Sequence, residues 1–548
     1  MIYADIFLTV LELAFAAGLY ALAIYAEKAL NPFWRILYAI PLIVCGVAAA
    51  ITGYEICMIG VYIGAALMLT GFIMEKRRTR QAGCVMAAVC MVLSVLACNV
   101  NPGYRAPDYV ADFKRAFAEL KTHYMLAEYK GINWDALYEE YLPQFKEADK
   151  AHDEVENAIL WRKFTYEFHD GHVAYSTSEN IAGCAEDMYY GNDYGLSVMM
   201  LEDGKYVAVN VEKDSEAANA GIHNGTVITE WNGQTVEESE KNAEVSFAAF
   251  PVEENEKFYN GILAAGVGGE QVSVTYIGDD GKEKKTELKK LGAYAKRMHG
   301  TLDILHMGLE GDNLSWHHID DNTECLRIKQ MMYDSQSYSN GDHSKMEQEI
   351  KSRILELKQS GINNLVIDLR SNGGGSPQFI MAIAGLLAPK GEHVYAYDGV
   401  WDNDNKEFKK DPDTGKYVVG EGLMFEGEDL WGHGQIVILV NSETVSAGDH
   451  LTKMMGEYEN VTVIGFTEST SSGQGVRAAV LSEGQLSYSA IPVLTADGEI
   501  FVDTDKSRKS TIPLDVKVPF DEEAVHAIFD EGRDYILDYA VEYLKESK

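Results

Sequence analysis

Cysteine is scarce in this chain. Seven cysteines occur among 548 residues, and five of them lie in or beside apolar runs of the first hundred residues, where cysteine commonly serves as a small hydrophobe. No pair has the CxxC spacing of a metal site, so no metal is expected. Cys184 and Cys325 remain, and the sequence leaves open whether they form a disulfide.

Positive charge is also in short supply. Lysine and arginine number 47 against 84 aspartates and glutamates, which gives a formal net charge of −37. All of the acidic excess lies beyond residue 100. Because such a surface repels nucleic acid, no nucleic-acid partner is expected.

The first hundred residues contain few charges of either sign. They contain four apolar runs, each close to the ~20 residues that a helix needs to cross a bilayer. The chain begins MIYAD, which is acidic, unlike the basic start of a cleaved signal peptide. The pattern predicts a four-helix transmembrane region over residues 1–100, with buried soluble helices as the alternative. The runs cover roughly 6–26, 36–53, 56–74 and 82–98.

Basic residues lie in the links after the first and third runs, the latter reading EKRRTR, and the remaining links have none. The positive-inside rule therefore predicts a multi-pass protein of the cell membrane with both termini outside the cytoplasm. Everything beyond about residue 100 would face the extracytoplasmic side, and the lipid bilayer would be a partner. Glu12, inside the first run, is the one hint that this region does more than anchor the chain.

The remaining chain divides into three regions by pattern. Residues 101–185 carry apolar residues at three- and four-residue spacing, which predicts a helical lead-in. Residues 186–292 change to short alternating strands with glycine turns, and residues 293–548 alternate strands with helices. The expected fold class is therefore multi-domain, with a mostly-β domain and an α/β core behind the membrane region.

Two strand-to-helix turns in the last region are candidates for chemistry. The apolar run NLVIDLR is followed by SNGGGSP, whose glycines allow close approach and can direct N–H groups at an anion. The run QIVILVNS leads to Ser446 at the start of a helical pattern. A serine there either caps the helix or acts as a nucleophile aided by the helix dipole.

The middle region resembles a PDZ domain of the bacterial protease-associated kind, through YGLSV followed by EAANAGIHNGTVITEWNGQTV. The resemblance implies that residues 186–292 bind a peptide's terminal carboxylate through backbone N–H groups while the peptide adds a strand. The alternative is an unrelated small β-domain. The loop that would bind the carboxylate consists of Tyr194, Gly195, Leu196 and Ser197.

Four further motifs occur in order: IDLRSNGGGS, VNSETVSAGDHL, VTVIGFTESTSSGQG and IPLDVKV. Together they resemble the C-terminal processing and tricorn-like serine peptidase family over roughly residues 105–520. The resemblance implies an α/β peptidase core of the Clp-protease/crotonase type over 293–548 and no cofactor. It also implies protein or peptide substrates, with Ser446 as the nucleophile of an S-A-x-[DE] motif.

The usual base of that family is missing. Many members have a lysine about twenty-five residues after the serine, and here that position is Ser471. The nearby stretch SSGQG offers Gln474, which cannot accept a proton at useful pH. Lys453 and His450 lie on the helix of the serine itself, and neither is well placed.

The tricorn-like branch takes its base from the helical lead-in, where its D-x-H pattern falls on FHDGHVAYS. The resemblance therefore implies His172 as the general base, with His169 in reserve, because imidazole titrates near neutral pH. It further implies that Asp503 or Asp505 orients the imidazole. Backbone N–H groups of Ala447 and of Gly373 or Gly374 would bind the oxyanion.

The sequence thus predicts a membrane-anchored, extracytoplasmic serine endopeptidase that recognises substrate carboxyl ends through PDZ. An inactive family member that binds or senses peptides is the alternative. The oligomeric state stays open.

Overall fold

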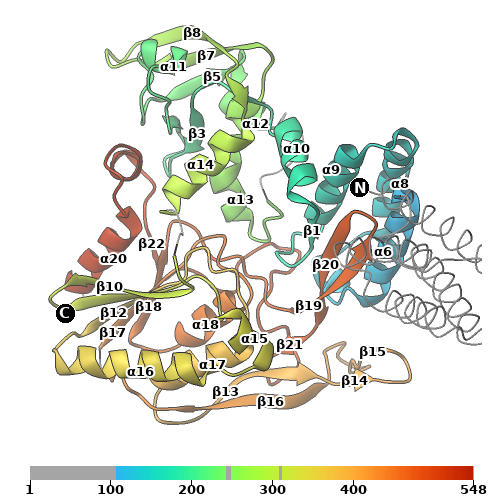
Figure 1. Ribbon diagram of the computed structural model, residues 1–548, viewed down its shortest axis with the longest axis vertical. Helices are drawn as coiled ribbons and strands as arrows, with labels where there is room; N and C mark the ends of the chain where they lie inside the picture. The colour runs from blue at the N-terminus through green and yellow to red at the C-terminus, as the bar shows by residue number, and fades with distance from the viewer. Residues whose placement is uncertain (1–106, 242–247, 308–310, 433, 547–548) are drawn as a thin grey trace, which may run out of the picture. The chain divides into compact units, whose positions relative to one another are not determined.

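The computed structural model describes residues 107–241, 248–307, 311–432 and 434–546 (Figure 1). The chain divides into two compact units. The smaller unit comprises residues 1–112 and 480–483, and the larger one comprises residues 113–479 and 484–548. Every candidate site residue lies in the larger unit, which is described below.

Within the described ranges, no helix is both long enough and apolar enough to cross a bilayer. The described helices carry charge along their length, as in SKMEQEIKSRILELKQ of α16 (Ser344–Gln359). The four apolar runs that predicted membrane spans lie in residues 1–106, outside the described residues. We therefore correct the predicted fold class and the predicted multi-pass localisation, because no described helix supports a membrane region.

The first described region is helical. Side-chain caps begin several of its helices, because the first N–H groups of a helix lack partners in the helix. Asn133 accepts from Ala136 N, and Asp153 accepts from Val155 N and Glu156 N. Its helices are α6 (Tyr109–His123), α7 (Ala127–Lys130), α8 (Trp134–Ala151), α9 (Glu154–Tyr166) and α10 (Glu179–Tyr189).

Aromatic side chains pack these helices together. Phe113 stacks on Phe145 with ring centroids 4.6 Å apart, and Trp161 lies 4.8 Å from Phe145. Helix α9 ends before Asp170, where a turn leads into strand β1 (Ala174–Ser176). The turn therefore projects from a well-packed base.

The described residues between 190 and 305 form small sheets of short strands, consistent with the glycine turns of the sequence. The sheet orders are β3-β4, β2-β9 and β6-β5-β7-β8. The strands are β2 (Asn192–Asp193), β3 (Ser197–Met200), β4 (Tyr206–Val209), β5 (Ile228–Trp231), β6 (Gln234–Thr235), β7 (Gln271–Ile277), β8 (Glu283–Lys289) and β9 (Gly292–Ala293). The helices are α11 (Glu216–Asn219), α12 (Val236–Glu240), α13 (Glu253–Asn260), η2 (Gly261–Gly266) and α14 (Ala295–Leu305).

The third region is built on a six-stranded sheet of order β10-β11-β12-β17-β18-β22. Within this sheet β11, β12, β17, β18 and β22 are parallel to one another, and β10 pairs with β11 antiparallel. The strands are β10 (Leu314–Asp320), β11 (Thr323–Ile328), β12 (Asn364–Asp368), β17 (Gln435–Leu439), β18 (Val461–Gly465) and β22 (Val516–Lys517).

Both faces of this sheet are covered (Figure 1). Ile436 and Ile438 of β17 pack with α16, α17 (Pro377–Leu387) and α18 (Ala447–Met455). Val437 and Leu439 belong to the opposite core, which includes α20 (Tyr535–Glu546). Burial on both faces explains why the central strands read as continuous apolar runs.

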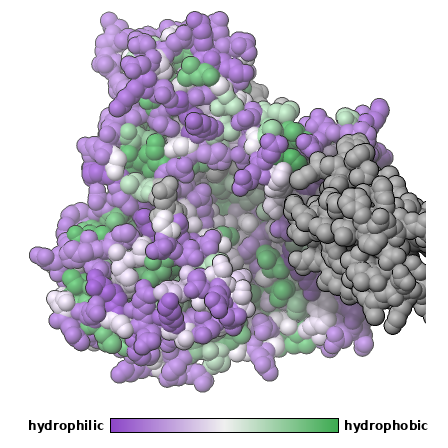
Figure 2. Space-filling model, in the orientation of Figure 1, coloured by the Kyte–Doolittle hydropathy of each residue, from purple (hydrophilic) through white to green (hydrophobic). Residues whose placement is uncertain are grey.

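Further strands flank the central sheet. β1 pairs antiparallel with β20 (Gly484–Ile491), with Ala174 opposite Ser487, so the segment after His172 is fixed to the third region. A second sheet has the order β16-β13-β21, from β13 (Gly391–Gly399), β16 (Val419–Gly427) and β21 (Val493–Leu494). Figure 2 shows one face of the molecule that is mostly hydrophilic with small separate apolar patches, as expected from the net charge of −37.

Candidate active site

Ser446 lies at the turn between β17 and α18, as the N-cap of α18. Its φ is 61° and its ψ is −118°, a conformation that serine rarely adopts. A residue held in such a region costs of order 1–3 kcal/mol, which the surrounding structure must offset. The side chain is half-buried. The serine is thus held in a strained conformation by a rigid strand-turn-helix unit.

The side chain of Asp449 holds this turn in place through hydrogen bonds. Its fully buried carboxylate accepts N–H bonds from Ser446 (3.2 Å), Ser471 (3.0 Å) and Ser472 (3.0 Å). Burial raises the pKa of Asp449 to about 7, and the N–H bonds oppose that rise. The acid of the S-A-x-[DE] motif therefore ties Ser446 to the segment at 471–472.

His172 lies on the turn between α9 and β1, and Asp170 anchors that turn. The fully buried carboxylate of Asp170 accepts the backbone N–H of His172 at 2.9 Å. It also accepts the hydroxyls of Tyr124 (3.1 Å), Ser472 (2.6 Å) and Ser489 (2.8 Å). Such bonds favour the ionised carboxylate. The base candidate is therefore positioned by a buried polar cluster.

Ser472 brings the two candidates together. Its carbonyl accepts the Ser446 N–H at 3.0 Å, and its hydroxyl accepts the N–H of Gly171, the residue before His172, at 3.0 Å. A Cβ on Gly171 would lie 2.6 Å from the Thr470 methyl carbon, so the approach requires glycine. One residue thus links the backbones that carry Ser446 and His172.

The imidazole of His172 is half-buried, and its Nδ1 has no hydrogen-bond partner among the described residues. Burial lowers the pKa of His172, Asp170 opposes that change, and Lys130 adds to it. The neutral imidazole is therefore the form present at pH 7, which is the form able to accept a proton.

The two acids predicted to orient His172 lie elsewhere. Asp503 is fully buried, and its carboxylate lies 2.9 Å from Lys130 Nζ. Burial raises the pKa of Asp503 to about 7, and Lys130 opposes the rise. Asp505 accepts the N–H of Ser507 at 2.8 Å in a local turn. Since His172 Nδ1 is unpartnered in the described residues, neither acid binds that nitrogen.

The reserve candidates have other contacts. His450 is buried, its Nδ1 is hydrogen-bonded to the Tyr395 hydroxyl, and burial lowers its pKa to about 3. Lys453 pairs with Glu457 at 3.4 Å on an accessible part of α18. The carbonyl of His169 accepts from Lys130 at 2.9 Å.

The residues at the positions where the usual lysine would lie make hydrogen bonds within the fold. Gln474 is buried, donates to Val502 O at 2.9 Å and accepts the N–H of Val493 at 2.8 Å. The Ser471 hydroxyl lies 2.8 Å from that of Thr511. The structure thus agrees with the sequence in offering no Ser-Lys pair at this place.

Gly374 packs directly against Ser446. Its φ is +79°, and a Cβ there would lie 2.6 Å from Ser446 Cβ and 3.2 Å from Ala447 N. The predicted oxyanion donors already have partners, however. Gly373 N donates to Lys329 O at 3.2 Å, and Gly374 N donates to Asn372 Oδ1 at 2.9 Å. Either N–H would have to exchange its acceptor to bind an oxyanion.

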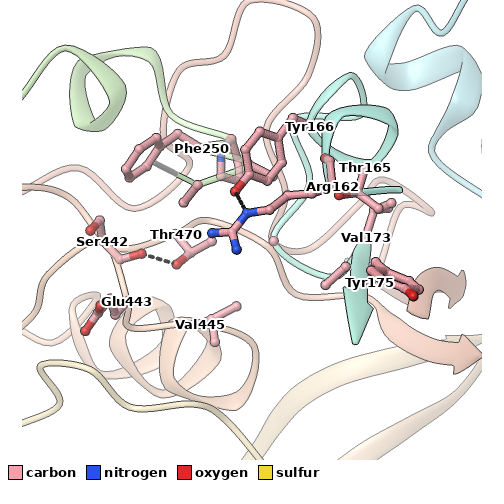
Figure 3. A pocket seen from close by; sticks show the side chains of 15 residues that line it. Arg162, Thr165, Tyr166, Val173, Tyr175, Phe250, Ser442, Glu443, Val445 and Thr470 are labelled. Carbon is pink, nitrogen blue, oxygen red and sulfur yellow. Dashed lines mark hydrogen bonds between the residues drawn. The ribbon is translucent and has the colours of Figure 1, made fainter. Parts of the chain in front are cut away.

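A cavity of about 390 Å³ opens beside the two candidates (Figure 3). Val445 and Gly171, which precede Ser446 and His172, both line it. Arg162 extends into it and donates to the Tyr166 hydroxyl at 2.6 Å. The rest of its lining is Thr165, Val173, Ala174, Tyr175, Ala248, Ala249, Phe250, Pro251, Ser442, Glu443 and Thr470.

The predicted peptide-binding loop uses its groups for internal packing. Tyr194, Gly195, Leu196 and Ser197 are all buried. Tyr194 donates its hydroxyl to Gly269 O at 2.7 Å, and Gly195 N donates to Asp193 Oδ1 at 2.8 Å. The Ser197 hydroxyl lies 2.8 Å from that of Thr301.

Sequence reasoning missed Lys130, Tyr124 and Ser472 as parts of this cluster. No short-range pattern marks them, because their partners are far away in the chain: 374 residues separate Lys130 from Thr504, and 302 separate Ser472 from Asp170. Cys184 and Cys325 are both free, so the disulfide left open by the sequence is not formed.

Known proteins resemble this chain in sequence and in fold. Residues 323–506 match peptidase family S41, and residues 106–154 match the tricorn protease C1 domain. A probable CtpA-like serine protease of Staphylococcus epidermidis is 24% identical over 337 residues, which cover 61% of this chain and 55% of the relative. A probable CtpA-like serine protease of Staphylococcus aureus is 23% identical over the same shares. The chain thus spans about half the length of these curated relatives.

Among solved structures, mature CPAF complexed with lactacystin has a TM-score of 0.52 at 12% identity, covering 83% of this chain and 100% of that chain. This is a likeness of fold. The motifs that suggested a serine peptidase lie mostly within the S41 match. Residues 323–506 are therefore similar to peptidase family S41, and the curated relatives that match the chain are probable serine proteases.

Proposed function

We propose that this chain is a serine endopeptidase that hydrolyses protein or peptide substrates, with Ser446 as nucleophile and His172 as general base. The observation that carries this proposal is the bridge made by Ser472. Its carbonyl accepts from Ser446 N and its hydroxyl accepts from Gly171 N, each at 3.0 Å, within an S41 segment.

The chemistry follows the roles of a serine triad. Neutral His172 takes the proton of the Ser446 hydroxyl as the oxygen attacks the substrate carbonyl, and then gives it to the leaving amine. Water completes hydrolysis of the acyl-enzyme by the same proton path. The ionised Asp170, hydrogen-bonded to the His172 backbone, stabilises the imidazolium that forms between the two transfers.

The oxyanion is bound by backbone N–H groups beside Ser446. Ala447 N lies at the positive end of α18, where negative charge is favoured. Gly374 supplies the second N–H once it releases the side chain of Asn372. Gly373 is the alternative second donor.

The cavity beside Val445 and Gly171 receives a substrate side chain. Its wall mixes apolar and polar groups in similar measure, and the hydroxyls of Thr165 and Thr470 are bonded to backbone carbonyls. Arg162 is paired with Glu186 at 2.9 Å, so its charge is compensated. We therefore favour an uncharged side chain over an acidic one.

Residues 186–292 serve as a PDZ domain that recognises substrate carboxyl ends, with residues 101–185 as the lead-in and 293–548 as the core. Motif order supports this, and so does β3, whose one sheet partner among the described strands is β4. The full chain carrying Ser446→Ala should bind a peptide with an apolar last residue better as the free acid than as the amide. Equal binding of the two forms would remove carboxylate recognition from the proposal.

One observation favours the alternative of an inactive peptide-binding member. Both glycine donors of the oxyanion site are bonded elsewhere, Gly373 to Lys329 O and Gly374 to Asn372 Oδ1. A fluorophosphonate probe separates the two functions, because it modifies only an activated serine. We expect labelling of the full chain at Ser446, and none in Ser446→Ala. A wild-type chain that resists the probe and cleaves no protein would establish the binding function instead.

A further inference from the structure

Lys130 is a buried lysine that the proposed mechanism has not used. It ends helix α7, and Gly131 after it adopts the left-handed conformation with φ 72°. Its side chain is only 3% exposed. A buried ammonium is costly unless acceptors surround it, so a lysine in this place needs a structural or functional reason.

Four oxygens satisfy this ammonium. Lys130 Nζ lies 2.9 Å from His169 O, from Thr504 O, from Thr504 Oγ1 and from Asp503 Oδ1. They belong to two segments that are far apart in sequence from α7. Lys130 therefore joins the lead-in helix, the turn at 169–172 and the segment at 503–504.

The turn held by Lys130 is the one that carries the base. His169 has φ 43°, a conformation that non-glycine residues seldom adopt, and its carbonyl is one of the four acceptors. Asp170 follows directly and accepts the His172 N–H at 2.9 Å. Losing the Lys130 contact would free the start of this turn, and with it the position of the imidazole.

Lys130 also balances charge beside His172. Two fully buried carboxylates, Asp170 and Asp503, share this one ammonium. When His172 takes the Ser446 proton, it becomes a second positive charge in this cluster. Lys130 disfavours that protonation, whereas Asp170 favours it. The titratable groups facing Lys130 are Asp503, Asp170, Asp505, His172 and His169.

We propose that Lys130 is a positioning residue for His172. Lys130 holds the turn that carries the base in place and contributes a positive charge beside it. This rests on the proposed function of Ser446 and His172. Lys130 touches neither Ser446 nor the cavity that would hold substrate. Its effect on the reaction would act through the turn and through electrostatics.

The test measures the rate of fluorophosphonate labelling of the full chain as a function of pH. Lys130→Met should slow labelling at its optimum by roughly 10- to 100-fold, as for residues that orient a functional group through an intermediate. The midpoint of the profile should move to higher pH, because removing a positive charge makes His172 easier to protonate. Lys130→Arg keeps the charge and should keep the midpoint.

Two further variants control for folding. Lys130→Met/Asp503→Asn removes the carboxylate that the single variant would leave buried and unpaired. Its labelling should stay as slow as in the single variant, because the contact to His169 O is still lost. Lys150→Met, at an exposed lysine of α8 whose side chain is 80% accessible, should leave rate and midpoint unchanged.

An unmoved midpoint in a folded Lys130→Met variant, with wild type labelled normally, would overturn the role of Lys130 alone. Recovery of the wild-type rate in the double variant would also overturn the proposal. It would show that Lys130 serves only to neutralise Asp503. A wild-type chain that is not labelled at Ser446 would instead refute the proposed function.

Discussion

The segments that carry Ser446 and His172 are built in opposite ways. Ser446 follows a strand in the middle of the sheet and begins a helix, so regular secondary structure determines its place. His172 lies on a turn, and its place depends on the neighbouring Asp170 and on Ser472 and Lys130 from distant segments. The fold positions one group, and a buried polar cluster positions the other.

This difference has a consequence for robustness. An apolar strand tolerates many substitutions, because burial is non-directional. A polar cluster fails when one member is lost, since the remaining buried groups are left without partners. The base side should therefore be more sensitive to single changes at a distance than the nucleophile side.

The largest effect is expected at the two groups themselves. Ser446→Ala and His172→Ala should each lower peptide hydrolysis by about 10⁴-fold or more, with peptide binding nearly intact. The double variant should be about as slow as either single one, because one catalytic unit is removed. Steady-state assays of purified full chains measure this.

His450→Ala is the control for that experiment. It removes the buried imidazole on the helix of the serine, which burial keeps neutral. Full activity in His172→Ala together with its loss in His450→Ala would transfer the base to the helix of the serine. Activity that survives Ser446→Ala would discard the mechanism.

Gly374→Ala should come next. A Cβ there would meet Ser446 Cβ at 2.6 Å, and the backbone φ of +79° disfavours any side chain. We expect a loss of roughly 10²–10³-fold in kcat, the usual cost of removing one oxyanion donor. Gly361→Ala is the matched control, with φ +83° and nothing within 4 Å of its Cβ. Equal losses in both variants would show that backbone strain, not the contact with Ser446, is responsible.

The pH dependence tests the environment of His172. Burial lowers its pKa below the usual value of about 6.5, so hydrolysis should rise with pH through one ionisation below that value. Below this ionisation the rate should fall about tenfold per pH unit. A kcat/KM profile of the free enzyme measures it. A midpoint at or above that of free histidine would contradict the burial of the imidazole.

Asp170→Asn tests the cluster by stability. In the fold the Lys130 and His172 charges and the Ser472 hydroxyl outweigh burial, so the pKa of Asp170 is lowered. Its contribution is therefore present above the unfolded pKa of about 3.9 and is lost as pH falls through the folded pKa. Wild type should lose more unfolding free energy between pH 5 and pH 3 than Asp170→Asn, as measured by urea denaturation. An equal loss in both proteins would show that Asp170 is not preferentially ionised by the fold.

Sequence patterns predicted the apolar strands that position Ser446 well. NLVIDLR, QIVILVNS and VTVIGF correspond to β12, β17 and β18, because strands covered on both faces must be apolar throughout. The break at 170–171 and the start of a helix after Ser446 were also readable. The membrane region did not carry over, since it rested on residues outside the described structure.

The polar cluster around His172 could not be predicted from the sequence in the same way. FVDTD offers two acids, and only the fold shows that Asp503 is buried against Lys130 while Asp505 closes a local turn. Lys130 has no local signal at all, because its acceptors come from segments 39 and 374 residues away. Charge pairs between distant segments obey no periodicity, so they emerge only in the structure.

The smallest effect is expected at Lys453, which gives the comparison its sharpest contrast of two lysines. It lies on the same helix as Ser446, yet its side chain is 32% exposed and pairs with Glu457 at 3.4 Å. Such an i,i+4 surface pair contributes about 0.3–0.5 kcal/mol. Lys453→Ala should therefore keep the labelling rate within about twofold and change the unfolding free energy by less than about 0.5 kcal/mol. Lys130 is buried in a polar cluster, whereas Lys453 is partly exposed to solvent. For the effect of a lysine on activity, burial should therefore matter more than proximity in sequence to the nucleophile. A tenfold or larger loss of labelling in Lys453→Ala would reverse that conclusion and make a Ser-Lys pair on α18 the better mechanism.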